Sequence, residues 1–287
     1  MEIQPHTFTP QHPLLKKHVS YFYFLKTDSP TFETQYYAFP STNTVLNIHR
    51  QVACDIQRYY TRVYEDPSNP YLAILQGMRE LPLRAHLQGR LDKVTIIFSP
   101  LGLNQFLGVP FLQVGPKDSQ IFTAWNHLPH YHAFLQNFYA TQDNHTRAQL
   151  LEDFLLSLYT PLPEQELLEK TLALLADFEL ERSIEEISRH VGVTTRTLHR
   201  TFKKHVGISP VGYRKIARFR HSLHNKLVVS HFKKLTEVGY ASNFYDQAYF
   251  NKIYKQLTGS NPTAFFNAIA PLANDRLIFQ FLKDEAV

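Results

Sequence analysis

The feature that most constrains the fold of this chain is a short sequence motif, called the corner below, that occurs twice in its C-terminal third. The segment TFKKHVGISPVGY at residues 201–213 returns as IYKQLTGSNPTAF at residues 253–265, with an offset of 52 residues. Five features return in register: Phe202 and Tyr254, Lys203 and Lys255, Gly207 and Gly259, Pro210 and Pro262, Tyr213 and Phe265. The fold must therefore build the same local structure twice.

The first copy follows the signals of a helix-turn-helix. Ser183 and Glu186 form an S-x-x-E capping box that begins a helix, and Gly192 can adopt the left-handed conformation that ends one. A second helix, TRTLHRTFKKH, is expected to begin with Thr194 or Thr195 as its cap. Helix, tight turn and helix are the parts of a helix-turn-helix.

The second copy repeats these signals. Leu235, Val238, Gly239 and Asn243 stand 51 residues after Ile184, Ile187, Ser188 and Gly192, so the second corner is one residue longer than the first. Asn243 takes the place of Gly192, and asparagine tolerates positive φ better than most residues do. The segment DQAYFNKIYKQL is therefore predicted to be the second helix of the second unit.

The second helix of each copy has a packing face and a polar face. Leu198, Thr201, Phe202 and His205 are expected to face the preceding helix, with Arg196, His199, Arg200 and Lys203 opposite. In the second copy Phe250 and Tyr254 are expected to be buried, with Gln247, Ala248, Asn251, Lys252 and Lys255 exposed. Such a polar face suits DNA, since Gln and Asn can pair with adenine, Arg with guanine and Lys with phosphate.

A long helix is predicted between the copies, from about residue 210 to residue 228. It begins at Pro210 and has one apolar stripe, formed by Tyr213, Ile216, Phe219, Leu223 and Leu227. Its length of roughly 28 Å is comparable with the 34 Å repeat of B-DNA. We expect this helix to hold two recognition helices at neighbouring segments of the major groove. Its cations, among them Arg214, Lys215 and Arg218, are expected to contact phosphate or nothing.

Charge is divided unevenly along the chain. Residues 181–270 hold fifteen Lys or Arg against five Asp or Glu, which is +10, and the remainder holds fifteen against twenty, which is −5. This asymmetry is typical of a chain in which one domain binds a polyanion and the other does not. A solvated basic surface is the alternative explanation, and the repeat pattern favours the polyanion.

The first 125 residues have the pattern of a sheet. Short aromatic and β-branched runs, HVSYFYFLK, TVLNIHR, VACDIQRYY, YLAILQG and KVTIIF, alternate with turn signals. Helical spacing follows at Phe134, Phe138, Leu150, Phe154, Leu155 and Leu158, and again from about residue 164 to residue 177. We expect a sensor or dimerisation domain at 1–160, a linker helix at 161–180, a DNA-binding domain at 181–270 and a tail at 271–287. Apolar residues of the tail, Leu277, Ile278, Phe279, Phe281 and Leu282, are expected to dock onto a domain.

These motifs resemble the AraC/XylS family of transcription regulators over about residues 175–268. FYDQAYFNKIYKQLTGSNPTAF is similar to the family pattern G-F-x-D-Q, F, F-K-K, G and P-x-x-Y/F, and TLHRTFKKHVGISPVGY also fits it. Gly239, Asn243 and Lys252 depart from the usual Ala, Gly and Arg. The resemblance implies that Arg196, His199 and Arg200, with Gln247, Ala248, Asn251 and Lys252, face the major groove, and that Lys203 and Lys255 contact phosphate or nothing.

A weaker resemblance extends to the N-terminal region, at FPSTNTVLNIH and KVTIIFSPLGLNQFLGVP. It implies the sheet-and-helix sensor domain that precedes this DNA-binding module in some AraC-type proteins. The expected fold class is therefore α+β, with a β-rich sensor domain, cupin-like or related, followed by an all-α domain of two helix-turn-helix units joined by a long helix. The expected partner is double-stranded DNA, and a small-molecule effector and a homodimer partner stay open.

Other classes of protein fit the sequence less well. His127, His130 and His132 suggest a metal-dependent cupin-like enzyme fused to a DNA-binding module, but Pro129 interrupts them and no flanking carboxylate completes a ligand set. A single cysteine, Cys54, argues against alkyl-transfer repair, and no phosphate-binding glycine motif occurs. An architectural DNA-binding protein without an effector is a further alternative.

We therefore expect a sequence-specific DNA-binding transcription regulator modulated through its N-terminal domain by an effector or partner, with the architectural protein and the metal-dependent enzyme as the alternatives. We expect no catalytic residue, cofactor or metal. We also expect no association with a membrane, and a cytoplasmic location because no secretory signal is seen.

Overall fold

The computed structural model describes residues 6–115, 118–227, 234–272 and 277–282. Its strands form two six-stranded sheets, sheet A in the order β1-β2-β9-β4-β7-β10 and sheet B in the order β11-β12-β3-β8-β6-β5. The strands of sheet A are β1 (His6–Phe8), β2 (Val19–Thr27), β4 (Thr44–Arg50), β7 (Tyr71–Gln76), β9 (Leu91–Phe98) and β10 (Gln120–Ile121). Those of sheet B are β3 (Glu33–Ala38), β5 (Val52–Gln57), β6 (Tyr60–Glu65), β8 (Leu83–Gln88), β11 (Ala270–Leu272) and β12 (Leu277–Phe281).

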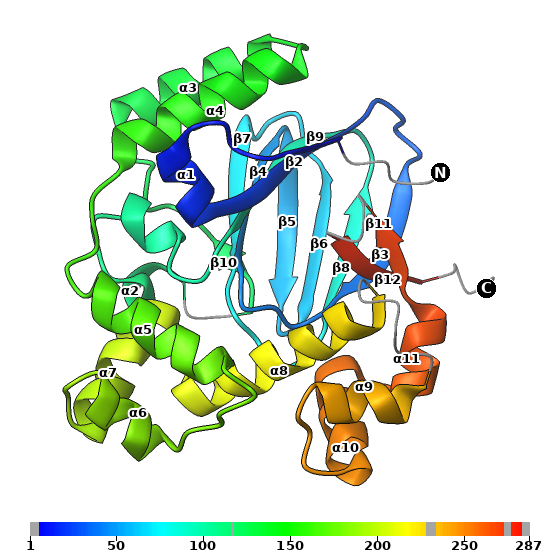
Figure 1. Cartoon of the computed structure of the whole chain (residues 1–287). Coiled ribbons are helices and arrows are strands. Elements are labelled where there is room, and N and C mark those ends of the chain that lie inside the picture. The colour runs from blue at the N-terminus through cyan, green and yellow to red at the C-terminus, as the bar shows by residue number, and fades with distance from the viewer. Residues whose placement is uncertain (1–5, 116–117, 228–233, 273–276, 283–287) are drawn as a thin grey trace.

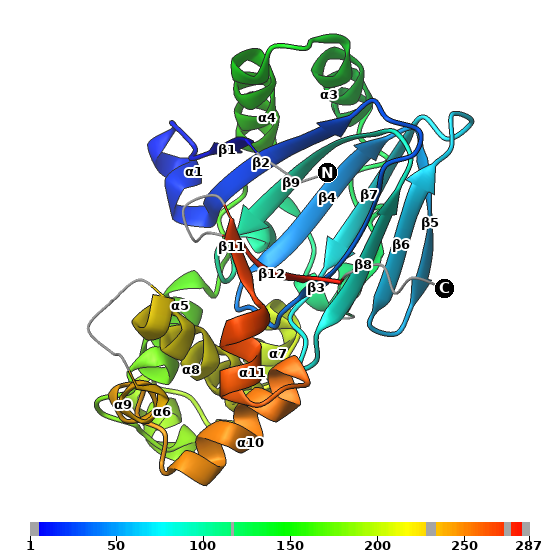
Figure 2. The same cartoon turned by 90° about the vertical axis from the view of Figure 1, so that its right-hand side faces the viewer.

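Helices α3 and α4 lie above the sheets in Figures 1 and 2, and the helices of the C-terminal region lie below them. Those of the N-terminal region are α1 (Pro13–His18), η1 (Leu103–Phe106), α2 (Phe111–Val114), α3 (Pro129–Ala140) and α4 (Asn144–Leu158). Those that follow are α5 (Gln165–Ala176), α6 (Ile184–His190), α7 (Thr195–Val206), α8 (Pro210–Leu227), α9 (Leu235–Ala241), α10 (Gln247–Thr258) and α11 (Pro262–Ala268). Among the described residues, no helix is both long and apolar enough to cross a bilayer.

Sheet A is covered on its outer side by the α3–α4 hairpin. Its largest core cluster joins Phe22 and Phe98 of the sheet to Phe138 and Phe154 of the hairpin, with Trp125 between them. The indole Nε1 of Trp125 donates to the carbonyl of Phe106 at 2.8 Å, so the polar atom of this buried ring is satisfied. A second cluster fills the space between the sheets. Central strands such as β9 are therefore buried on both faces, which explains the continuous apolar run in KVTIIF.

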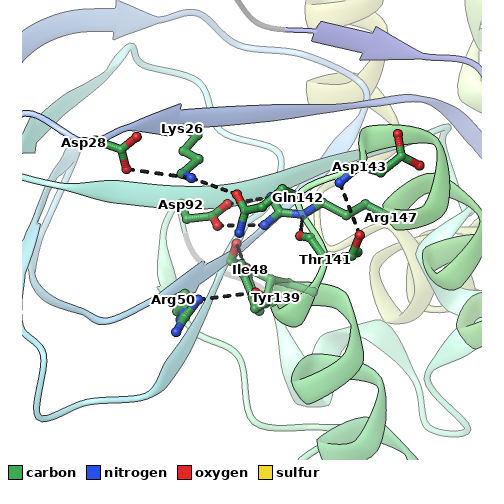
Figure 3. A network of polar contacts seen from close by, with 10 residues as sticks. All are labelled: Lys26, Asp28, Ile48, Arg50, Asp92, Tyr139, Thr141, Gln142, Asp143 and Arg147. Carbon is green, nitrogen blue, oxygen red and sulfur yellow. Dashed lines mark hydrogen bonds and ion pairs between the residues drawn. The ribbon is translucent and has the colours of Figure 1, made fainter.

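A buried ion pair fastens the hairpin to sheet A (Figure 3). The guanidinium of Arg147 in α4 donates to both carboxylate oxygens of Asp92 in β9 at 2.8 Å, and its Nε donates to the carbonyl of Thr141 at 2.9 Å. The Tyr139 hydroxyl donates to the carbonyl of Ile48 at 2.8 Å. These bonds satisfy buried polar groups and fix the hairpin, so we assign the network a structural role.

The predicted strand runs are confirmed, although one of them forms two strands and several other strands were not predicted. VACDIQRYY is not a single strand, because Tyr59 has φ +57° and turns the chain between β5 and β6. The sequence analysis missed β3 and β8, whose facing side chains are polar. His86 in β8 lies 2.7 Å from the Glu33 carboxylate in β3, and Arg84 donates to Gln35. The alternation in LRAHLQ, with Leu83, Ala85 and Leu87 buried, was a signal for β8 that the sequence analysis overlooked, whereas polar residues at positions 33–35 obscure β3.

The end of the described chain returns to the N-terminal sheets. β12 pairs with β3 in antiparallel register, and the ring of Phe279 lies 4.4 Å from that of Tyr36. The tail therefore docks on sheet B, a partner that the sequence did not identify; residues 273–276 and 283–287 of this tail lie outside the described residues. The fold is α+β, with β-rich N-terminal sheets followed by a helical region, as expected.

Candidate nucleic-acid interface

The first unit consists of α6 and α7. Ser183 and Glu186 form the predicted capping box, with the Ser183 N–H donating to the Glu186 carboxylate at 2.7 Å. Gly192 has φ +74°, and Thr194 caps α7 by accepting from the N–H of Thr197. Leu198, Phe202, His205 and Val206 are the buried residues of α7. The predicted helix-turn-helix is confirmed, and Thr194 is the cap that the sequence left undecided.

The second unit consists of α9 and α10. Asn243 has φ +53°, the conformation expected where the first unit has glycine. Asp246 caps α10 by accepting from the N–H of Tyr249 at 2.6 Å. Phe250, Ile253, Tyr254, Leu257 and Thr258 are the buried residues of α10. Gly207 and Gly259 end α7 and α10 with φ of +83° and +80°, so the repeated corner has the same backbone in both copies.

The candidate DNA-contacting side chains lie on the outer faces of these two helices. On α7, Arg196, Arg200 and Lys203 are exposed and His199 is partly buried. On α10, Ala248, Asn251, Lys252 and Lys255 are exposed and Gln247 is partly buried. The amide of Gln247 donates to the Asn251 carbonyl oxygen at 3.5 Å, so these two side chains are aligned along one edge of the helix. Contact of all these residues with DNA stays a prediction.

Helix α8 joins the two units, which lie near its two ends (Figure 1). Its apolar stripe is buried from Tyr213 to Leu223 and partly buried at Leu227, and three of its cations, Arg214, Lys215 and Arg218, form ion pairs within the chain. Arg218 lies 2.6 Å from the Glu181 carboxylate, and Lys215 lies 2.9 Å from that of Glu80. The guanidinium of Arg218 also lies over the rings of Phe178 and Phe244. These α8 cations therefore hold α8 to the loop before α6 and to the loop before β8, which the sequence analysis did not foresee.

The first unit contacts the N-terminal region and the linker, and α11 after the second unit contacts the N-terminal region. In the first, the amide of Asn104 donates to the carbonyl of His205 at 3.0 Å, and Lys204 lies 3.2 Å from the Glu164 carboxylate. Beside the second, the ring of Phe265 in α11 packs against Phe39 at 4.8 Å. α7 is therefore attached to η1 of the N-terminal region, and α11 is attached to Phe39.

A cavity of about 280 Å³ lies where the two sheets meet α8 and β12. Aromatic rings of Tyr21, Tyr23, Tyr36, Phe39 and Phe279 line it together with polar side chains. Two arginines line it as well, Arg79 from the N-terminal region and Arg220 from α8. A molecule in this cavity would contact the sheets, the linking helix and the C-terminal strand at once.

Among the described residues, no carboxylate lies within ion-pair distance of the cations around this cavity, although the charge of Asp118 acts on Arg79 and partly offsets the lowering of its pKa by burial. Arg220 donates to the carbonyls of Pro40 and Phe39, and Arg79 donates to that of Ala38 while its Nε has no partner. Behind them Lys93, 3% exposed, lies 3.3 Å from the Asn47 amide oxygen. None of the ion pairs among the described residues includes these three cations. Burial lowers the pKa of both guanidinium groups and lowers that of Lys93 to about 8.

The alternative enzyme sites gain no support from the geometry. His127, His130 and His132 are exposed, and Nε2 of His132 lies 2.9 Å from the carbonyl of Asn126. In the described part of the chain, no three His, Cys, Asp or Glu side chains are grouped as metal ligands. Burial raises the pKa of the Cys54 thiol, which is the opposite of what a reactive thiolate requires.

Sequence reasoning missed the cations of the cavity and one residue of the second unit. Lys93 gave a signal, as a lysine at the start of the apolar run KVTIIF, but Arg79 and Arg220 lie far apart in sequence and gave none. Tyr245, directly before α10, is 90% exposed. An exposed aromatic ring beside a recognition helix is a candidate for DNA contact.

Comparisons with known proteins bear on the C-terminal region. Residues 187–268 match the family described as "Helix-turn-helix domain". Among solved structures, ToxT from Vibrio cholerae O395 is similar at 14% identity, covering 88% of this chain and 98% of that chain with a TM-score of 0.45. ToxT from Vibrio cholerae strain SCE256 with a bound unsaturated fatty acid is 15% identical, covering 85% of this chain and 94% of that chain with a TM-score of 0.46. The comparison with curated proteins found no match.

Proposed function

We propose that this chain, a DNA-binding transcription regulator with an AraC-type helix-turn-helix domain at residues 187–268, recognises one DNA site through two neighbouring segments of the major groove. The observation that carries the proposal is the pair of matched units, each with an exposed polar face on its second helix. α8, 18 residues long, spans about 27 Å between its ends and serves as the spacer between the two units. A single chain then supplies both recognition helices, without a second copy.

In this proposal the roles of the side chains follow their chemistry. Arg196 and Arg200 contact guanine edges, Gln247 and Asn251 contact adenine edges, and Lys203 and Lys255 bind phosphate. Phosphate contacts give most of the affinity, so binding weakens steeply with salt. The proposed division of the chain is a sensor region at 1–160, a linker at 161–180, the DNA-binding domain at 181–270 and a tail at 271–287. A cytoplasmic location and the absence of catalysis belong to the same proposal.

The N-terminal region is proposed to regulate this binding through a small effector in the cavity. Support comes from the origin of its lining, since Arg79 belongs to the N-terminal region and Arg220 to α8. Buried cations without carboxylate partners are costly, and a negatively charged ligand would offset that cost. We therefore propose an effector that carries an anionic group between these two arginines.

The experiment for the DNA-binding function is a selection from random duplexes with the full chain, followed by titration of the winner and a scrambled duplex at two salt concentrations. A preference of about a thousandfold or more supports a regulator. Equal, steeply salt-dependent binding to both duplexes would instead support the architectural alternative.

The effector proposal has a separate test in thermal unfolding. Benzoate and other small carboxylates should raise the melting temperature of the full chain more than their primary amides do. Arg79→Met should remove this difference, because the variant keeps most of the side-chain volume without the charge. Equal shifts for acids and amides, or the same acid preference in Arg79→Met, would exclude an anion at this position.

A further inference from the structure

The two recognition helices differ at the centre of their exposed faces. With the 52-residue offset, Arg196 in α7 corresponds to Ala248 in α10. Nine residues, or two and a half turns, separate Ala248 from the buried Leu257, so Ala248 lies directly opposite the packing face. The part of a recognition helix opposite its packing face is the part that enters the groove. The first unit thus presents a long cation there, and the second presents a single methyl group.

The small side chain of Ala248 leaves a hollow on the surface of α10. Tyr245, Asp246, Ala248, Tyr249 and Lys252 line it. Ala248 and Lys252 are four residues apart and share one side of α10, and Tyr245, which precedes the N-cap Asp246, borders the same hollow. The ring of Tyr245 is 90% exposed and has little packing of its own. The hollow is shallow and open, and it is bordered by the methyl group of Ala248, two tyrosine rings, the Asp246 carboxylate and the Lys252 ammonium group.

From this arrangement, and resting on the proposed function, we infer that the hollow receives the C5-methyl group of a thymine in the second half of the site. The thymine methyl is the apolar feature that the major groove presents at base edges, and alanine and aromatic side chains are suited to contact it. Charge complementarity favours DNA as the occupant, because Lys252 and Lys255 are exposed on the same helix. Residues 181–270 carry a balance of +10 in addition.

The inference assigns different chemistry to the two units. Arg196 has donors for the acceptors of guanine, whereas Ala248 has no hydrogen-bonding group and discriminates by apolar contact alone. Tyr245 and Tyr249 become specificity-determining residues, because they set the width of the hollow. The repeated corner thus positions two recognition helices that distinguish different base pairs at the same structural position.

The test replaces single thymines of the selected site by deoxyuridine, which removes only the methyl group. At one thymine of the second element, the full chain should bind about fourfold more weakly after replacement, the loss expected for one buried methyl. Ala248→Leu fills the hollow and keeps a good helix former, so it should bind both duplexes equally. Ala173→Leu, the same change at an exposed position of α5, is the matched control and should keep the fourfold ratio.

A second variant tests for a new base preference rather than for the loss of one. Ala248→Arg recreates the side chain of the first unit and should change the preferred base pair at that position from thymine to guanine in a repeated selection. Selection of a two-element site in which no thymine is sensitive to its methyl group would overturn this inference and leave the proposed function intact. Unchanged methyl discrimination in Ala248→Leu would also overturn it, and the hollow would then face a protein partner or solvent. Failure to select any site would count against the proposed function itself.

Discussion

At the scale of single residues, Gly239 shows where this chain departs from an optimal helix. Glycine in the interior of a helix costs about 1 kcal/mol relative to alanine. A Cβ added at Gly239 would meet Oε1 of Gln247 at 3.6 Å and Cγ of Phe250 at 3.7 Å, which are ordinary contacts. Gly239→Ala should therefore raise the free energy of unfolding by about 1 kcal/mol, with a higher melting temperature by calorimetry.

Gly259→Ala is the natural comparison for this substitution. Gly259 ends α10 with φ +80°, a conformation that alanine adopts only with strain, so this variant should melt at a lower temperature. A lower melting temperature for Gly239→Ala as well would mean that the second unit needs glycine for closer packing than the structure shows.

Lys93 makes stability depend on pH through its burial. Its pKa falls from 10.5 to about 8 because burial disfavours the charged form. Between these values the unfolded chain binds more protons than the folded chain, so the free energy of unfolding should rise from pH 8 toward pH 10. Below pH 8 both states are protonated and this contribution stays constant.

Urea unfolding of the native chain and of Lys93→Met, at pH 7.5 and pH 9.5, checks this expectation. The native chain should gain stability relative to the variant at the higher pH, because methionine has no proton to release. Equal changes in the two proteins would show that another group dominates this pH range.

At the scale of elements, the helices of the C-terminal region were the most predictable. Capping residues, positive-φ corners and 3.6-residue spacing are local signals, and Ser183, Gly192 and Asn243 fulfil them in the structure. β3 was hard to predict because its first three residues are all polar, whereas the alternation of apolar and polar residues in β8 was a signal that was overlooked. The pairing of the α8 cations also depends on the fold, since Glu80 and Lys215 are 135 residues apart.

The recognition helix α7 gives a prediction that separates base contact from phosphate contact. Arg200→Ala should cost about 1 to 3 kcal/mol in binding and relax the base preference at one position, whereas Lys203→Ala should weaken all duplexes alike and lower the salt dependence. Titration of both variants with the selected and scrambled duplexes distinguishes the two effects. If Arg200→Ala retained both affinity and preference, the recognition face of α7 would be assigned wrongly.

At the scale of the whole molecule, the C-terminal region packs back onto the N-terminal region. The N-terminal sheets contact the first unit through η1, they contact α11 through Phe39, and they accept β12 from beyond the second unit. The sequence predicted two helix-turn-helix units and a β-rich region, because each follows from local patterns. It could not predict the cavity, which assembles Tyr36, Arg79, Arg220 and Phe279 from four distant segments.

The central claim is that one chain uses two recognition helices at a separation fixed by α8. The measurement that tests it most directly is affinity for the selected site with one to ten base pairs inserted between its two elements. The account predicts that an insertion of five, about half a helical turn, lowers affinity to that of a duplex with one element. An insertion of ten should not restore it, because α8 cannot span a further turn. Affinity that is independent of the insertion would contradict the claim.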